Sequence, residues 1–257
     1  MYRRQWVTEK VQKVLARSGA GSRREIERLI KAGRVSADGR SVQIGDRVDG
    51  TATLRIDGRQ IRSQQRDRIR TRVIVYHKPE GEICTRSDPG GRPTVFARLP
   101  EPKGGRWVSV GRLDINTSGL LLLTNDGELA DRLMHPRNRF EREYACRVRG
   151  RVESRHIDQM LKGVRIDGDR ARFERIEMGH GHGVNRWYNV VLTQGRYREV
   201  RRIWEASGLQ VSRLIRIRYG PIQLPRDLPP GRWFELQAPL LRQIQSVDGL
   251  EHDTGKR

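Results

Sequence analysis

The segment from Gly111 to Gly127, GRLDINTSGLLLLTNDG, carries the most distinctive polar pattern in the sequence. Arg112 and Asp114 flank a single leucine, and a Thr-Ser-Gly turn and a strongly apolar run follow. This pattern places the charged pair at the rim of a sheet, where a cleft can form and a carboxylate can act as a nucleophile or a general base. An aspartate in a polar loop is more often a turn or capping residue, so the spacing alone does not identify a catalyst.

Two other segments hold candidate functional residues. Tyr144 lies among alternating charged and apolar residues that predict a strand, a pattern typical of a half-buried core aromatic. Arg198, Arg201 and Arg202 lie at helical spacing, which is typical of a solvated basic face and also of a face that binds phosphate. The residues alone leave both alternatives open.

Neither a metal site nor a disulfide framework is predicted. Cys84 and Cys146 have no CxxC spacing and no histidine close in sequence. His180 and His182 in GHGHG lack third and fourth ligands within reach, so we interpret residues 179–183 as a flexible loop.

The charge of the chain indicates an anionic partner. Its 257 residues include 52 lysines and arginines, 45 of them arginine, against 31 acids, for a net charge of +21. The planar arginine fork suits phosphate contacts and base stacking, so nucleic acid is favoured over an anionic membrane. The longest apolar run, Leu120 to Leu123, is far too short to span a bilayer, and we expect a soluble cytoplasmic protein.

The N-terminal quarter predicts a small α+β module. Apolar residues at helical spacing predict two short helices over 9–32, the second opened by a capping box of Ser22 and Glu25 and closed by Gly33. Alternating residues around Asp-Gly pairs at 38 and 57 predict hairpin strands over 34–61. Residues 1–70 carry 18 basic against 8 acidic residues, so the exposed face of the second helix is expected to meet phosphate through Arg23, Arg24, Arg28 and Lys31.

The rest of the chain predicts a larger domain in which strands outnumber helices. Strands are expected near 73–77, 107–110, 120–124, 144–148, 187–193 and 214–219, with helices near 126–134, 157–161 and 200–204. We therefore predict the α+β class with a mainly antiparallel mixed sheet. The expected parts are a module over 1–65, a basic linker over 66–72, a domain over 73–245 and a polar tail over 246–257.

Several of these segments together resemble the pseudouridine synthases that act on ribosomal RNA. GRLDINTSGLLLLTNDG is similar to the family signature, whose catalytic aspartate lies in its Arg-Leu-Asp. LARSGAGSRREIERLIKAGRV resembles the S4 RNA-binding module that precedes the catalytic domain, EREYACRV resembles the segment with the active-site tyrosine, and QGRYREVRRIWEASG resembles the third motif. The matches follow the family's order over most of residues 8–240, and the third motif is similar to the branch that acts on the large ribosomal subunit.

This resemblance implies a reaction and a role for each candidate. A uridine within an RNA chain is isomerised: the bond from ribose C1′ to base N1 breaks and C5 joins C1′ instead, with no cofactor. Asp114 is then the catalyst, as a nucleophile or as a base on the sugar, Tyr144 stacks on the target base and Arg201 keeps the carboxylate ionised. Arg112 fills the gap that the extruded base leaves in its stem. Phosphate contacts are expected from Arg198 and Arg202.

The implied partner is ribosomal RNA, either a stem-loop of the large-subunit RNA or an assembling ribosomal particle, and the enzyme is expected to act as a monomer. One alternative is a synthase that acts on small-subunit ribosomal RNA or transfer RNA, which the form of the third motif disfavours. The other is a non-catalytic ribosome-assembly RNA-binding protein, which the intact candidate residues disfavour. The loop at 179–183 departs from the family's pattern.

Overall fold

The structure is a computed structural model that describes residues 8–61, 70–102, 104–181 and 185–246. The chain divides into two compact units, the first made of residues 1–72, 100–108 and 124–127 and the second of the remainder. Thr124 and Asn125 hydrogen-bond the main chain of Arg72 at 2.8 Å, and all three residues belong to the first unit. The domain bounds expected from sequence remain a prediction. Residues 66–69 of the expected basic linker and residues 247–257 of the expected polar tail lie outside the described residues.

The first unit contains two short helices and short antiparallel strands. One sheet has the strand order β3-β2-β5-β6, and β1 pairs with β4. Both Asp-Gly pairs are hairpin turns with positive φ at each residue, as type I′ turns require, so the two predicted hairpins are confirmed. The elements are β1 (Glu9–Lys10), α1 (Val11–Arg17), α2 (Arg23–Lys31), β2 (Val35–Ala37), β3 (Arg40–Ser41), β4 (Arg47–Val48), β5 (Leu54–Ile56) and β6 (Arg59–Ile61).

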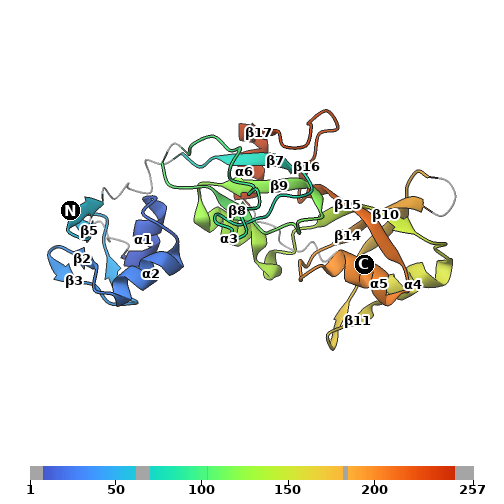
Figure 1. Cartoon of the computed structure of the whole chain (residues 1–257), viewed down its shortest axis with the longest axis horizontal. Helices are drawn as coiled ribbons and strands as arrows, with labels where there is room; N and C mark the ends of the chain where they lie inside the picture. The colour runs from blue at the N-terminus through green and yellow to red at the C-terminus, as the bar shows by residue number, and fades with distance from the viewer. Residues whose placement is uncertain (1–7, 62–69, 103, 182–184, 247–257) are drawn as a thin grey trace, which may run out of the picture. The chain divides into compact units, whose positions relative to one another are not determined.

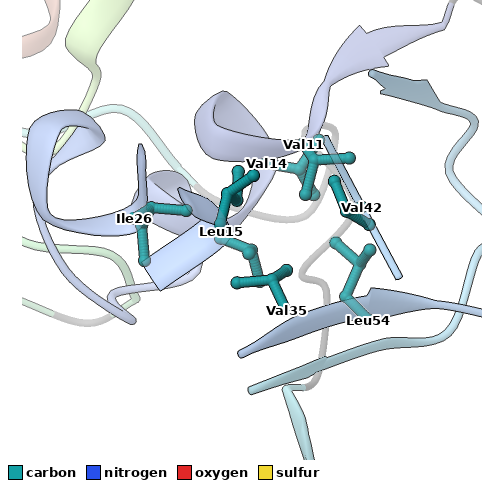
Figure 2. Packing of buried hydrophobic residues seen from close by; sticks show 8 residues of the cluster. Val11, Val14, Leu15, Ile26, Val35, Val42 and Leu54 are labelled. Atoms are coloured by element: carbon teal, nitrogen blue, oxygen red, sulfur yellow. The ribbon is translucent and has the colours of Figure 1, made fainter. Parts of the chain in front are cut away.

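Helix α2 begins at the predicted capping box. The Ser22 hydroxyl accepts the N–H of Glu25 at 3.1 Å, and the Glu25 carboxylate accepts the N–H of Ser22 at 3.3 Å. Ile26 and Ile30 on its inner face join a core that α1 and the strands complete. Figure 2 shows Ile26 with the members of this core that α1 and the strands contribute. The basic residues of α2 remain exposed. The core members are Val11, Val14, Leu15, Ile26, Ile30, Val35, Val42 and Leu54.

A mixed sheet with the strand order β13-β14-β10-β15-β9-β7-β17 dominates the second unit (Figure 1). β16 pairs with β15, β8 pairs with β9, and β11 (Val164–Ile166) forms a separate hairpin with β12 (Asp169–Ala171). The pairing of β15 with β9 is parallel and most of the others are antiparallel, which confirms the predicted fold class. The strands are β7 (Val73–Lys78), β8 (Val108–Val110), β9 (Ser118–Thr124), β10 (Arg142–Arg149), β13 (Arg175–Met178), β14 (Asn185–Leu192), β15 (Gln210–Tyr219), β16 (Ile222–Gln223) and β17 (Trp233–Glu235).

The three predicted helices are present as α3 (Gly127–Met134), α4 (Ser154–Lys162) and α5 (Glu199–Ala206). α5 lies against β15 and buries Trp204 completely, with its ring 5.4 Å from that of Tyr188 and 6.0 Å from that of Phe173. Helix α6 (Ala238–Gln245) was not predicted, and Ile244 is its one buried residue. Among the described residues, no helix has the length and apolar character needed to cross a bilayer.

Gly119 lies where β9 meets β15. Its φ is +106°, and a Cβ would lie 2.6 Å from the main-chain nitrogen of Arg216 and still closer to its carbonyl oxygen. Neither the backbone of β9 nor that of β15 can move without disturbing the parallel pairing of Gly119 with Arg216. We expect Gly119→Ala to lower the free energy of unfolding by about 2–4 kcal/mol, through left-handed strain and overpacking. Gly127→Ala is the matched control, since its Cβ would meet open space. Equal stability of the two variants in urea denaturation would refute the packing argument.

Candidate active site

A cleft of about 1160 Å³ opens in the second unit. Its walls combine the loop between β8 and β9, the segment before α5, and parts of β10 and β15. Four residues that the sequence singled out line this cleft: Arg112, Asp114, Tyr144 and Arg198. The cleft is therefore the candidate active site.

Asp114 lies in a tight turn between two strands. Gly111 takes a φ of +75° directly after β8, a conformation that suits glycine. Thr117 then donates its main-chain N–H to the carbonyl of Asp114 at 3.0 Å, and β9 begins at the next residue. The carboxylate is thus presented to the cleft by a turn that is anchored to the sheet on both sides.

Lys78 holds this turn from the end of β7. Its side chain is fully buried, and Nζ donates to the carbonyls of Asp114 at 3.0 Å, Thr117 at 2.8 Å and Pro79 at 2.9 Å. Burial lowers the pKa of Lys78, an effect that nearby anionic groups oppose. Lys78 was not among the residues predicted for the site. Its signal is a lysine at the end of the apolar strand VIVYHK, where a charge needs internal acceptors.

Arg201 of α5 reaches the same turn from another direction. Its Nη2 donates to the carbonyl of Asn116 at 2.8 Å, and its Nη1 donates to the carbonyl of Val211 at 2.7 Å. Burial and the charge of Arg198 lower the pKa of Arg201, and the charge of Asp114 raises it. Within the described residues no ion pair joins Arg201 and Asp114. This arginine contacts the Asp114 turn through the carbonyl of Asn116 and not through the expected carboxylate.

Two contacts complete the anchoring of the turn. Gly81 donates its N–H to the carbonyl of Ile115 at 2.8 Å. Cys84 contacts both the N–H and the carbonyl of Leu113 through Sγ at 3.4 Å. All five carbonyls of residues 113–117 therefore have a partner, which fixes the backbone around Asp114 before any substrate binds.

Tyr144 is positioned on β10 by an irregularity in the sheet. The register between β10 and β15 shifts between Glu143 and Tyr144, so that Tyr144 pairs with Arg216. Such bulges re-aim side chains beside active sites. Tyr144 is 8% exposed and lines the cleft, so it is both a core aromatic and a wall of the site.

Three buried charged residues in the cleft wall escaped the sequence analysis. Arg142 donates to the carbonyl of Thr193 at 2.7 Å and to the hydroxyl of Tyr219 at 3.1 Å. Arg216 is 2% exposed and donates through Nε to the carbonyl of Leu120 at 2.7 Å. Burial raises the pKa of the third, Glu199. The alternation of inward and outward residues along β10 and β15 predicts inward positions for both arginines. From sequence alone, however, a charged residue is expected to face solvent.

The remaining predicted residues lie elsewhere. Arg202 does not line the cleft and instead pairs with Asp167. The basic residues Arg23, Arg24, Arg28 and Lys31 belong to α2 of the first unit. His182 lies outside the described residues, and within the described ranges no group of three or more His, Cys, Asp or Glu could hold a metal ion.

The family of the chain follows from this fold and from sequence comparison. Residues 72–206 match the family model for RNA pseudouridylate synthase, and residues 9–54 match that for the S4 domain. The chain belongs to the RNA pseudouridylate synthase family and carries an S4 domain before the catalytic domain. It is thus a pseudouridine synthase, as the sequence resemblance implied.

Its relatives are similar over nearly the whole chain. The ribosomal large subunit pseudouridine synthase B of Shigella flexneri is 54% identical over 98% of this chain and 87% of its own length. The protein of the same name from Haemophilus influenzae is 54% identical over 96% of this chain and 70% of its own. A crystal structure of a pseudouridylate synthase has the same fold, with a TM-score of 0.63, 23% identity, and coverage of 93% of this chain and 99% of that chain.

Proposed function

We propose that this enzyme converts a specific uridine of large-subunit ribosomal RNA to pseudouridine, with Asp114 as the catalytic residue. The observation that carries the proposal is the rigid presentation of one carboxylate in a cleft lined by arginines. The relatives named for the large ribosomal subunit, 54% identical along nearly the entire chain, support the choice of RNA.

The reaction rearranges bonds without net addition or loss of atoms. The bond between ribose C1′ and base N1 breaks, the base turns, C5 bonds to C1′, and the proton lost from C5 is balanced by one gained at N1. Asp114 assists either by attacking C1′ or by taking a proton from the sugar. Tyr144 supplies a flat surface for the target base, and Arg201 acts through the carbonyl of Asn116 as a positioning residue.

Binding of the RNA is divided between the two units in this proposal. The exposed basic face of α2 contacts phosphates, while Arg112 and Arg198 contact the substrate at the cleft. Arg112 fills the stack from which the target uridine is turned out. Arg202, which pairs with Asp167, contributes to phosphate binding outside the cleft. We further propose that the substrate is a stem-loop of the RNA, free or in an assembling ribosomal particle, and that the enzyme acts as a cytoplasmic monomer.

Pseudouridine mapping in cells with and without the protein tests this function. We expect one pseudouridine in large-subunit ribosomal RNA to be lost without the protein and to return when it is supplied again. Purified enzyme should then form the same pseudouridine in an unmodified transcript of that RNA, with no added cofactor. Loss confined to small-subunit ribosomal RNA or transfer RNA would assign a different substrate. An unchanged map would favour the non-catalytic RNA-binding alternative.

A further inference from the structure

Two apolar side chains are exposed at the cleft. Among the described residues, the large apolar side chains that are exposed are Ile44, Ile115, Met178, Tyr197 and Leu240. Of these, Ile115 and Tyr197 line the cleft, with 42% and 71% of their surface exposed. Ile115 directly follows Asp114, and Tyr197 lies in the segment before α5. Both are therefore placed to touch a substrate that occupies the site.

Hydrogen bonds hold the backbone around Tyr197, whereas the Tyr197 side chain is exposed. The Glu199 carboxylate accepts the N–H of Arg196 at 2.9 Å, and the Arg142 guanidinium donates to the carbonyl of Thr193 at 2.7 Å. Arg198 takes a φ of +51° at the start of α5, a conformation that non-glycine residues adopt rarely and that needs support from its surroundings. A fixed backbone lowers the ordering cost of a contact made by the exposed ring.

The charges around these two side chains indicate what they contact. Six arginines and three acids line the cleft, so an anionic chain is favoured there. An exposed ring between arginines is a combination that binds unstacked nucleobases, because each base offers a flat face and each nucleotide a phosphate. The arginines are Arg92, Arg112, Arg142, Arg196, Arg198 and Arg216, and the acids are Asp88, Asp114 and Glu199.

We propose that Tyr197 stacks on a nucleobase next to the modified uridine and that Ile115 provides a second apolar contact for the unstacked RNA at the cleft. This inference rests on the proposed RNA-modifying function and assigns a part of the same site. Tyr144, which is nearly buried, is reserved for the target base, whereas Tyr197 is exposed and contacts its neighbour. Tyr197 is thus a specificity-determining residue that acts through binding of the RNA beside the modified uridine.

Variants of Tyr197 test the proposal with a matched control. The probe is an unmodified transcript of large-subunit ribosomal RNA, and the measurements are RNA affinity and the single-turnover rate of pseudouridine formation. We expect Tyr197→Ala to weaken affinity about tenfold, the size of effect expected for one lost stack, and Tyr197→Phe to restore it. Met178→Ala removes a side chain that is 67% exposed but lies outside the cleft, and should match the wild type. Ile115→Ala should weaken affinity less than Tyr197→Ala.

An abasic scan identifies the base that Tyr197 contacts. Once the modified uridine is mapped, stem-loops with single abasic nucleotides on either side of it are compared in wild type and Tyr197→Ala. At one position the abasic substitution should weaken binding by the wild type and have no further effect on the variant. Wild-type affinity of Tyr197→Ala, or equal losses in Tyr197→Ala and Tyr197→Phe, would overturn the proposal. A wild type that binds RNA but forms no pseudouridine would refute the proposed function, while the affinities would still decide the role of Tyr197.

Discussion

Asp114→Asn should abolish pseudouridine formation and leave RNA binding near its wild-type level. The substitution removes one negative charge and almost no volume, and the carbonyl of residue 114 keeps its hydrogen bonds from Lys78 and Thr117. An amide can neither attack C1′ nor accept a proton from the sugar. The single-turnover rate is therefore expected to fall by about a thousandfold or more.

Asp131→Asn makes the same chemical change at an exposed position on α3 and serves as the control. It should show wild-type rates and a wild-type unfolding midpoint. The assignment of Asp114 fails if its Asn variant retains substantial activity. It also fails if the variant is inactive merely because it is unfolded, which its unfolding midpoint would reveal.

The second large effect is expected at Arg201. The guanidinium joins the carbonyls of Asn116 and Val211, which belong to different segments, and a lysine cannot donate in both directions from one planar fork. The Asp114 turn would lose one of its hydrogen bonds and could shift. A displacement of the catalytic group by about 1 Å lowers turnover by roughly a hundredfold. We expect this loss in Arg201→Lys with little change in RNA affinity.

Arg202→Lys is the matched variant on the neighbouring position of α5. Arg202 pairs with the exposed Asp167 outside the cleft, and a lysine can maintain such an ion pair. Its turnover should stay close to that of the wild type. Single-turnover rates and RNA affinities of both variants test whether Arg201 positions the Asp114 turn. Equally mild effects at the two positions would show that Arg201 is not a positioning residue.

The sequence predicted the features that depend on neighbouring residues. The capping box at Ser22 and the Asp-Gly hairpins are local, and their residue types require the observed geometry. The contacts of Lys78 with Thr117, of Arg201 with Asn116 and of Arg216 with Leu120 join residues 39, 85 and 96 positions apart. These depend on how the strands are ordered, so sequence spacing could not reveal them.

The turn that carries Asp114 is anchored through its main-chain carbonyls, so its shape does not depend on which side chains it carries. Ile115 and Asn116 are both exposed, yet their carbonyls are held by Gly81 and Arg201. Evolution or design can therefore exchange these two side chains without rebuilding the turn that carries Asp114. The same carboxylate can then be offered to RNAs of different shape by altering only its immediate neighbours.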